Sequence, residues 1–392
     1  MMNRNFLFKI MLCCLSWTLF TGMILTDVLA EGCGKYDPDR DYFPHKTTLR
    51  YAKGFSVSYH QHYKLLEIPM GADNSHMVRY WLVQCGTPVP EHSGNLDQVI
   101  IIPSKRVIPL ATTYLPFLVR YGMAERIVGV SRAAYVNTPL IRERLKSGQI
   151  KEIGVEGNMD FEAILKLEPS WIMPIGDASV LDGDFGKLRQ MGVPVVLHWG
   201  FLEETLLASV EWGKMLALFF NAEDEAERHF EQIRQTYESL ADKVRQPPRR
   251  PVVLAGSMFQ GVWYVSGGKS FLSRLIHDAG ARYLWEDTDF RGNRPYDFES
   301  LLSEGQHAEF WINPGIWNSR QEAMAEDPRY GLFDAMTHKG IYNNNRQLSP
   351  DGGNDYWENG LANPHLLLAD LIKIFHPEVI PDHELIWYKQ LE

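Results

Sequence analysis

The sequence is poor in cysteine, and it lacks a basic run and a second long apolar segment. Only 4 of the 392 residues are cysteine, and two of them, Cys13 and Cys14, fall in the apolar start of the chain. Beyond that start, no stretch reaches the ~20 consecutive apolar residues that cross a bilayer. The formal net charge is -10, and no cluster of Lys and Arg offers a basic face to phosphates, so nucleic acid is excluded as an expected partner.

The motifs of common catalytic classes are also missing. There is no Gly-x-Ser-x-Gly elbow, no His-Glu-x-x-His and no Cys-x-x-Cys. Gly267 to Ser270 ends like a phosphate-binding loop, but Trp263 stands where that loop needs its first glycine. We therefore expect no enzyme, no cofactor and no resident metal. An extracytoplasmic enzyme, or a binder of bare metal ions using His198 and carboxylates, is the lesser alternative.

Residues 1–30 read as a signal peptide. Arg4 and Lys9 precede an apolar stretch from 10 to 25, and small or apolar residues lead to Ala30. We expect cleavage after Ala30 and a periplasmic or otherwise extracytoplasmic protein; an uncleaved anchor is the alternative. Cys33 and Cys85 would then form a disulfide in an oxidising compartment. A lipid anchor on Cys33, which follows Gly32, remains open and would exclude that disulfide.

One long helix, residues 221–246, organises the middle of the chain. Apolar residues recur every three or four positions on one stripe: Ala226, Phe230, Ile233, Tyr237, Leu240 and Val244. Asn221 is expected to cap its start, with Asp224 as the partner of a capping box, and Pro247 ends it. Its length of roughly 36 Å suits a strut between two lobes; an ordinary surface helix is the alternative.

Strands and helices alternate on both sides of this helix, which predicts two α/β lobes with mainly parallel sheets. We expect a β-rich N-terminal extension over 31–98, an N-terminal lobe over 99–220 and a C-terminal lobe over 247–392. The apolar run 99–102 is expected to be the first buried strand of the N-terminal lobe.

Several segments resemble the periplasmic substrate-binding proteins of ABC importers for iron–siderophore complexes and vitamin B12. These segments are residues 106–110, 124–130 and 160–169 before the helix and 266–280 after it. The resemblance covers roughly residues 100 to 380; the extension departs from it. It implies two lobes joined by one stiff helix, a ligand in the cleft between them, and little closure on binding. It also implies that Glu162 and Glu299, each in an Asp-Phe-Glu segment, dock onto arginines of a membrane permease, although both could merely stabilise helix N-termini. We expect a monomer.

Ligands of parallel α/β sheets bind at the carboxyl ends of the strands. The loops there carry the candidate ligand-binding residues Thr112, Thr113, Tyr114, Arg132, Asn158, Trp199, Phe259, Trp263, Tyr264, Arg291, Arg294, Tyr296 and Trp317. A long polar and aromatic loop, residues 342–358, is a further candidate. Aromatic rings with a few arginines suit a large, partly anionic metal chelate. A ferric siderophore is expected and a cobalamin-like corrinoid is the alternative: arginines in the cleft favour the first, a mainly aromatic cleft the second.

Overall fold

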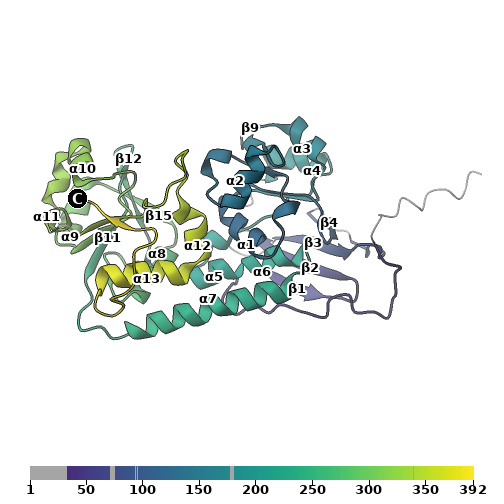
Figure 1. Ribbon diagram of the computed structural model, residues 1–392, viewed down its shortest axis with the longest axis horizontal. Coiled ribbons are helices and arrows are strands. Elements are labelled where there is room, and N and C mark those ends of the chain that lie inside the picture. The colour runs from purple at the N-terminus through teal and green to yellow at the C-terminus, as the bar shows by residue number, and fades with distance from the viewer. Residues whose placement is uncertain (1–32, 71–75, 93, 95, 177–180, 339) are drawn as a thin grey trace, which may run out of the picture.

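Two α/β lobes, a long helix and an N-terminal sheet make up the computed structural model (Figure 1). It describes residues 33–70, 76–92, 94, 96–176, 181–338 and 340–392. The expected signal peptide, residues 1–30, lies outside this range. No helix of the described part is long and apolar enough to cross a membrane.

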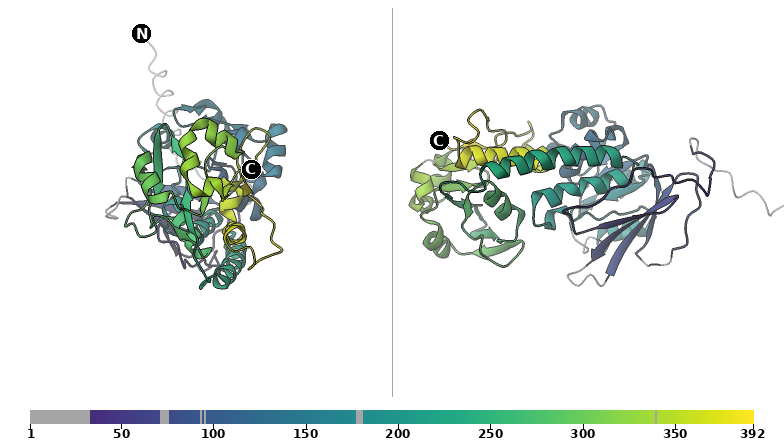
Figure 2. Two further views of the ribbon diagram at one scale, coloured as in Figure 1. Left: turned by 90° about the vertical axis from the view of Figure 1, so that its left-hand side faces the viewer. Right: turned by 90° about the horizontal axis from the view of Figure 1, so that it is seen from below.

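The connecting helix is α7, Glu223–Lys243, and it runs along both lobes beside α13 (Figure 2). Its predicted apolar stripe is buried at Ala226, Phe230, Ile233 and Tyr237. The predicted cap is wrong. Asn221 has a left-handed φ of 57°, and Ala222 precedes the helix without a side-chain bond. The Asn221 side chain is used elsewhere, because its Oδ1 accepts a hydrogen bond from Lys64 Nζ at 2.9 Å.

The N-terminal lobe contains a parallel sheet built on two short buried strands. These are β5 (Val107–Pro109) and β10 (Trp171–Met173), which pair in parallel, and single parallel bridges add Ile127 beside β5 and Val195 beside β10. The helices of this lobe are α1 (Leu115–Arg120), α2 (Pro139–Lys146), α3 (Phe161–Leu167), α4 (Asp184–Gln190), α5 (Leu206–Glu211) and α6 (Gly213–Leu218). Smaller pieces include β6 (Gly129–Val130), β7 (Lys151–Glu152), β8 (Gly154–Val155), β9 (Asn158–Met159), and the 3-10 turns η1 (Thr112–Tyr114), η2 (Ala124–Arg126), η3 (Ala133–Tyr135) and η5 (Gly200–Leu202).

The extension forms a four-stranded sheet whose order is β1 (Ser56–Tyr59), β2 (Tyr63–Met70), β3 (His76–Gln84) and β4 (Gln98–Ile102). The first three strands are antiparallel, and β4 joins β3 in parallel. The run 99–102, which we expected in the lobe's own sheet, therefore belongs to the extension's sheet. It is also not buried on both faces, because the side chain of Ile101 is 47% exposed.

Two buried charged residues attach the extension to α5, α6 and α7. Lys64 of β2 is 0% exposed; it pairs with Glu223 at the start of α7 and donates to the carbonyl oxygen of Leu218 at 2.8 Å. Glu211 is also 0% exposed and accepts backbone N–H groups from residues 50 to 52, at 2.7 Å from Tyr51. Buried charges are tolerated only when paired in this way, so the extension is an integral part of the N-terminal half.

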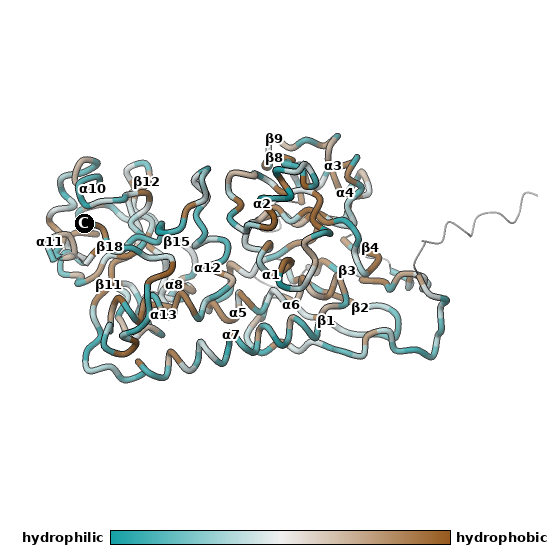
Figure 3. Tube along the Cα trace, in the orientation of Figure 1, coloured by the Kyte–Doolittle hydropathy of each residue, from teal (hydrophilic) through white to brown (hydrophobic). Residues whose placement is uncertain are grey.

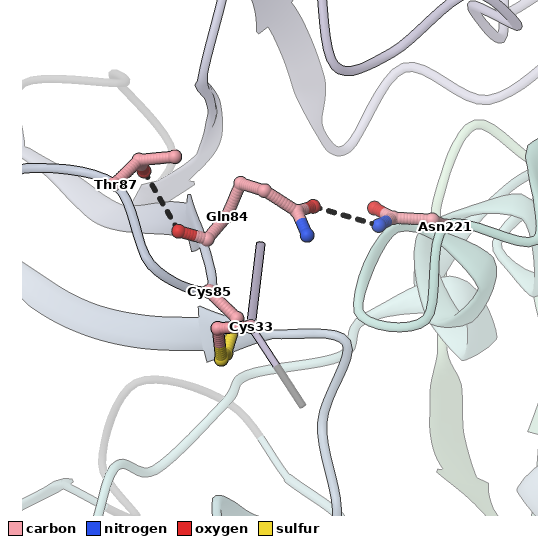
Figure 4. Close-up of a disulfide and its surroundings, with 5 residues drawn as sticks. All are labelled: Cys33, Gln84, Cys85, Thr87 and Asn221. Atoms are coloured by element: carbon pink, nitrogen blue, oxygen red, sulfur yellow. Dashed lines mark hydrogen bonds between the residues drawn. A yellow bond between two sulfur atoms is a disulfide. The ribbon is translucent and has the colours of Figure 1, made fainter. Parts of the chain in front are cut away.

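A disulfide between Cys33 and Cys85 fixes the beginning of the described chain to the end of β3 (Figure 4). The two Cα atoms are 5.4 Å apart. Beside it, Asn221 Nδ2 donates to Gln84 Oε1 at 2.9 Å. The disulfide, β3 and Asn221, two residues before α7, are thus joined in one place.

The C-terminal lobe has a five-stranded sheet in the order β14 (Arg282–Tyr283), β11 (Val252–Ala255), β16 (Phe310–Ile312), β17 (Ile341–Asn343) and β18 (Lys389–Gln390). All neighbours are parallel except β18, which is antiparallel to β17. A second, antiparallel sheet holds β12 (Met258–Phe259), β13 (Val262–Ser266) and β15 (Asn293–Tyr296). The helices are α8 (Phe271–Asp278), α9 (Phe298–Gly305), α10 (Arg320–Glu326), α11 (Asp334–Thr337), α12 (Asn359–Ala362) and α13 (Pro364–Phe375), with the 3-10 turns η6 (Pro328–Leu332) and η7 (Asp355–Trp357).

Apolar segments gather inside each lobe, while most of α7 is polar on its outer side (Figure 3). The two Asp-Phe-Glu segments have the same local structure: Asp160 caps α3 by accepting from Ala163 N at 2.9 Å, and Asp297 caps α9 by accepting from Ser300 N at 2.8 Å. The expected architecture of two mainly parallel α/β lobes and one long helix is confirmed.

Candidate ligand-binding site between the lobes

A cavity of about 270 Å³ lies between the lobes. The N-terminal lobe contributes η1, Ile175 two residues after β10, and α5; the C-terminal lobe contributes the start of α8 and the segment around α12. Its lining is Ala111, Thr112, Thr113, Tyr114, Phe117, Ile175, His198, Phe201, Leu206, Ser209, Val210, Phe271, Trp357, Leu361 and Ala362. This position, next to the carboxyl end of β10, is where ligands of α/β sheets are expected.

The cavity's lining is mainly apolar, and several of its large side chains remain open to solvent. Ile175 is 59% exposed, Phe201 46% and Trp357 49%. Exposed apolar groups gathered around a concave surface mark a binding site more often than a solvated face. The volume is slightly below the ~300–1,000 Å³ of typical small-molecule pockets, so a bulky ligand would extend past these three side chains.

Few polar groups face the cavity. The hydroxyl-bearing residues Thr112 and Thr113 are part of η1, and Ser209 is on α5. The Tyr114 hydroxyl donates to the carbonyl oxygen of Pro174 at 3.1 Å, and burial raises its pKa above the usual range. Tyr114 therefore stays neutral and has already used its proton within the lobe.

His198 is the one histidine among the residues that line this cavity. Its ring lies between those of Tyr114 and Trp212, with centroids 4.6 and 4.7 Å away. Burial lowers its pKa to about 3, so the imidazole is neutral at physiological pH. Its Nδ1 accepts from the N–H of Gly200 at 3.4 Å. The remaining proton of a neutral ring then resides on Nε2, which makes His198 a hydrogen-bond donor.

None of the arginines proposed for ligand binding is among the residues that line this cavity. Arg132 donates to the hydroxyl of Tyr135, Arg291 pairs with Glu204 of the other lobe, and Arg294 stacks on Phe290 with its guanidinium carbon 4.1 Å from the ring centroid. The Arg291–Glu204 pair is a bridge between the lobes rather than a free anion-binding group.

The proposed aromatic residues divide into buried and exposed groups. Trp263 and Trp317 are 0% and 4% exposed, and both rings pack against Trp311, which corrects the expectation that they line the cleft. The physical reason is that the Trp263 ring fills the core between the two sheets of its lobe. Phe259 and Tyr264 are instead 64% and 46% exposed, at the β12–β13 hairpin.

Three further candidates lie outside the cavity lining. Tyr296 packs edge-on against Trp285, and its hydroxyl donates to Glu304 at 3.4 Å. Asn158 is exposed in the short β8–β9 hairpin, and Trp199 is partly buried just before η5. Of the thirteen proposed ligand contacts, Thr112, Thr113 and Tyr114 line the cavity.

Sequence reasoning missed most of the apolar lining. Ile175, Phe201 and Phe271 were not singled out, because single apolar residues after strands and turns read as ordinary packing. Trp357 lies in the long loop that was proposed as functional. Residues 346–358 of that loop are called the strap below, because this segment leaves the C-terminal lobe and contacts the N-terminal lobe.

The two expected docking carboxylates are exposed on opposite lobes. The Glu162 side chain is 79% exposed and pairs with Lys166 at 2.6 Å; that of Glu299 is 80% exposed and lies 3.8 Å from Arg329. Such exposed pairs are worth little energetically, so both carboxylates are accessible to another protein's charges. No group of three or more potential metal ligands occurs in the described residues.

The family model for periplasmic binding proteins matches residues 107–347, which is more than half of the chain. The chain belongs to this family. The resemblance stated from the sequence is thereby confirmed, and the family consists of solute-binding proteins rather than enzymes. Its matched region spans both lobes and α7, and the extension precedes it.

Similar proteins agree with this fold. An uncharacterized lipoprotein of Methanocaldococcus jannaschii is 23% identical over 351 residues, covering 84% of this chain and 82% of the relative. A possible iron-binding, periplasmic solute-binding protein of Staphylococcus epidermidis superposes with a TM-score of 0.55 at 17% identity, covering 70% of this chain and 99% of the other. A periplasmic heme-binding protein of Pseudomonas aeruginosa gives a TM-score of 0.53 at 20% identity, covering 74% and 98%.

Proposed function

We propose that this protein captures a metal chelate with a broad apolar face and delivers it to the permease of an ABC importer. The observation that carries the proposal is the cavity between the lobes, whose apolar lining includes three solvent-accessible large side chains, Ile175, Phe201 and Trp357. Apolar walls with a few placed donors are typical of small-molecule sites. The fold supplies the cleft and the rigid α7 between the lobes.

The charge of the cavity favours the corrinoid alternative over the ferric siderophore first expected. No arginine is among the lining residues, whereas His198 Nε2–H and the hydroxyls of Thr112 and Thr113 are neutral donors. Neutral donors suit the amide oxygens at the edge of a corrinoid macrocycle. A ferric siderophore remains the second candidate, because Arg294 of β15 and Tyr264 of β13 are both exposed on neighbouring strands of the small antiparallel sheet.

Variants at the cavity test this proposal. Phe201→Asp puts a charge against the apolar wall, and we expect it to weaken cyanocobalamin binding at least about tenfold, since desolvating that charge costs ~1.4 kcal/mol or more. Leu332→Asp is the matched control, because Leu332 is 50% exposed in η6 and does not line the cavity. Isothermal titration calorimetry measures the affinities of both variants for cyanocobalamin and for ferric siderophores. Equal affinities of the two variants would refute the location of the site.

We further propose export with cleavage after Ala30 and a disulfide rather than a lipid at Cys33. Two relatives are named lipoproteins, but one sulfur cannot form both a thioether and a disulfide, and here Cys33 is joined to Cys85. The intact mass of the exported protein distinguishes the two forms, because a lipidated N-terminus adds the mass of its acyl chains.

A further inference from the structure

The strap is the segment of the C-terminal lobe that reaches across to the N-terminal lobe. Asp355 holds the strap to its own C-terminal lobe. This residue is 8% exposed and accepts hydrogen bonds from Trp387 Nε1 at 2.9 Å and from Asn359 Nδ2 at 2.5 Å. At the opposite side the strap meets η3 and the start of α2. Figure 1 shows this loop rising beside α2 in the space between the lobes.

Glu358 makes the central contact of the strap with the N-terminal lobe. Its side chain is 0% exposed; one carboxylate oxygen accepts the N–H of Asn137 at 2.7 Å, and the other accepts the N–H of Thr138 at 2.7 Å and also the Thr138 hydroxyl. Thr138 precedes α2, so the carboxylate lies at the positive end of that helix. Burial raises the pKa of Glu358, and these donors from the N-terminal lobe oppose the rise.

Three weaker contacts surround this one. Arg142 Nη2 pairs with Asp351 at 3.0 Å, and the Ser349 hydroxyl donates to the carbonyl oxygen of Ala134 at 3.1 Å. Gly353 is buried against the same turn, where a Cβ would lie 2.7 Å from the carbonyl oxygens of Ala134 and Tyr135. The strap therefore fits closely against the N-terminal lobe over several residues.

This contact is continuous with the cavity wall. Trp357 immediately precedes Glu358 and lines the cavity, and α12 follows at once with Leu361 and Ala362 in the same wall. The helix α12 contacts η1, α1 and α5 of the N-terminal lobe. The position of the C-lobe wall, apart from Phe271 of α8, thus depends on how the strap and α12 are held.

We propose that Glu358 is the positioning residue of the interlobe cavity. Its carboxylate clamps the strap to the start of α2, holds Trp357 and α12 against the cavity, and must leave the Asn137 and Thr138 donors for the lobes to separate. This inference rests on the proposed function only in taking the cavity as the ligand site. It differs from ligand contact, because Glu358 acts through Trp357.

The variant Glu358→Gln isolates this role with little change of volume. Its amide oxygen can still accept at Thr138, but its NH2 group then faces the N–H of Asn137, where two donors oppose each other. Thr138→Val removes only the hydroxyl donor and keeps both backbone donors, so its effect should be smaller. Glu384→Gln is the matched control, because it changes an exposed carboxylate of the same lobe.

The first measurement uses the protein without any ligand. Spin labels on Arg126→Cys and Gln321→Cys, two exposed positions on η2 and α10, report the distance between the lobes by double electron–electron resonance. We expect Glu358→Gln to raise the population of longer distances about tenfold or more, Thr138→Val to raise it less, and Glu384→Gln to leave it unchanged. An unchanged distance distribution in Glu358→Gln would overturn the proposal.

The second measurement separates positioning from general stability. The emission of Trp357 is identified as the part of the fluorescence that is lost in Trp357→Phe. Acrylamide should quench this emission more strongly in Glu358→Gln, while the midpoint of urea unfolding of each lobe stays within the range of the Glu384→Gln control. If unfolding shifts and quenching does not, Glu358 is structural only and the proposal fails. Because both measurements use ligand-free protein, their outcomes do not depend on whether the ligand is a corrinoid or a ferric siderophore. Faster release of cyanocobalamin from Glu358→Gln would extend the result to binding.

Discussion

Replacing Glu211 tests whether the extension is an integral part of the N-terminal half. The Glu211 carboxylate is 0% exposed and accepts from the backbone N–H groups of Arg50 at 3.0 Å, Tyr51 at 2.7 Å and Ala52 at 2.8 Å, and from Lys214 Nζ at 3.1 Å. In Glu211→Gln an amide NH2 replaces one accepting oxygen, and the buried Lys214 loses a charge partner. Breaking a buried pair by removing one partner costs about 3–5 kcal/mol.

We therefore expect the free energy of unfolding of Glu211→Gln to fall by about 4 kcal/mol, a large part of the ~5–15 kcal/mol of a typical domain. Urea unfolding followed by circular dichroism measures this loss. Glu227→Gln is the control: its side chain is 45% exposed although it contacts the same lysine, so it should cost no more than about 1 kcal/mol. A loss below about 1 kcal/mol in Glu211→Gln would refute the argument that this carboxylate attaches the extension.

Three further predictions concern His198, the two docking carboxylates and the disulfide. Because the pKa of His198 is about 3 in the folded protein, the unfolded chain binds more protons between pH 6.5 and 3, and the free energy of unfolding falls as the pH drops below 6.5; at pH 5 the loss is about 2 kcal/mol. His198→Phe should remove that part of the pH dependence of urea unfolding. An unchanged pH profile in this variant would count against the buried neutral imidazole. Charge reversal at both Glu162 and Glu299 should abolish ligand uptake by cells and leave affinity intact, whereas a loss of affinity would show that these carboxylates do not act in docking. Cys33→Ser should free the Cys85 thiol for alkylation in the exported protein, and an already reactive Cys85 in the unmutated protein would contradict the disulfide.

Periodic patterns predicted α7 and the two lobes well, because an amphipathic helix and a strand buried on both faces show their burial in the local sequence. The exact start of α7 was not predictable in this way. Asn221 is a favourable capping residue by itself, but the buried Lys64 needs acceptors, and the Asn221 side chain serves that need. A contact between residues 157 positions apart overrode the local preference.

The sheet membership of β4 could not be read from the sequence either. An apolar run such as 99–102 pairs equally well with either of two neighbouring sheets, and here it adds in parallel to β3. Likewise, loop position alone did not separate Trp263, which fills the core, from Trp357, which lines the cavity. The missing information was the direction of each side chain, which for Trp357 depends on how the strap crosses between the lobes.

A direct binding measurement decides whether this protein captures a metal chelate. Binding is measured by the tryptophan fluorescence of the exported protein. The protein is titrated in parallel with cyanocobalamin, a panel of ferric siderophores and free metal salts, and a control corrects for absorption by coloured ligands. We expect saturable quenching by a chelate, with cyanocobalamin binding more tightly than the siderophores, and a smaller quenching amplitude in Trp357→Phe. No response to either class of chelate, or a response to free metal salts alone, would contradict the proposed function.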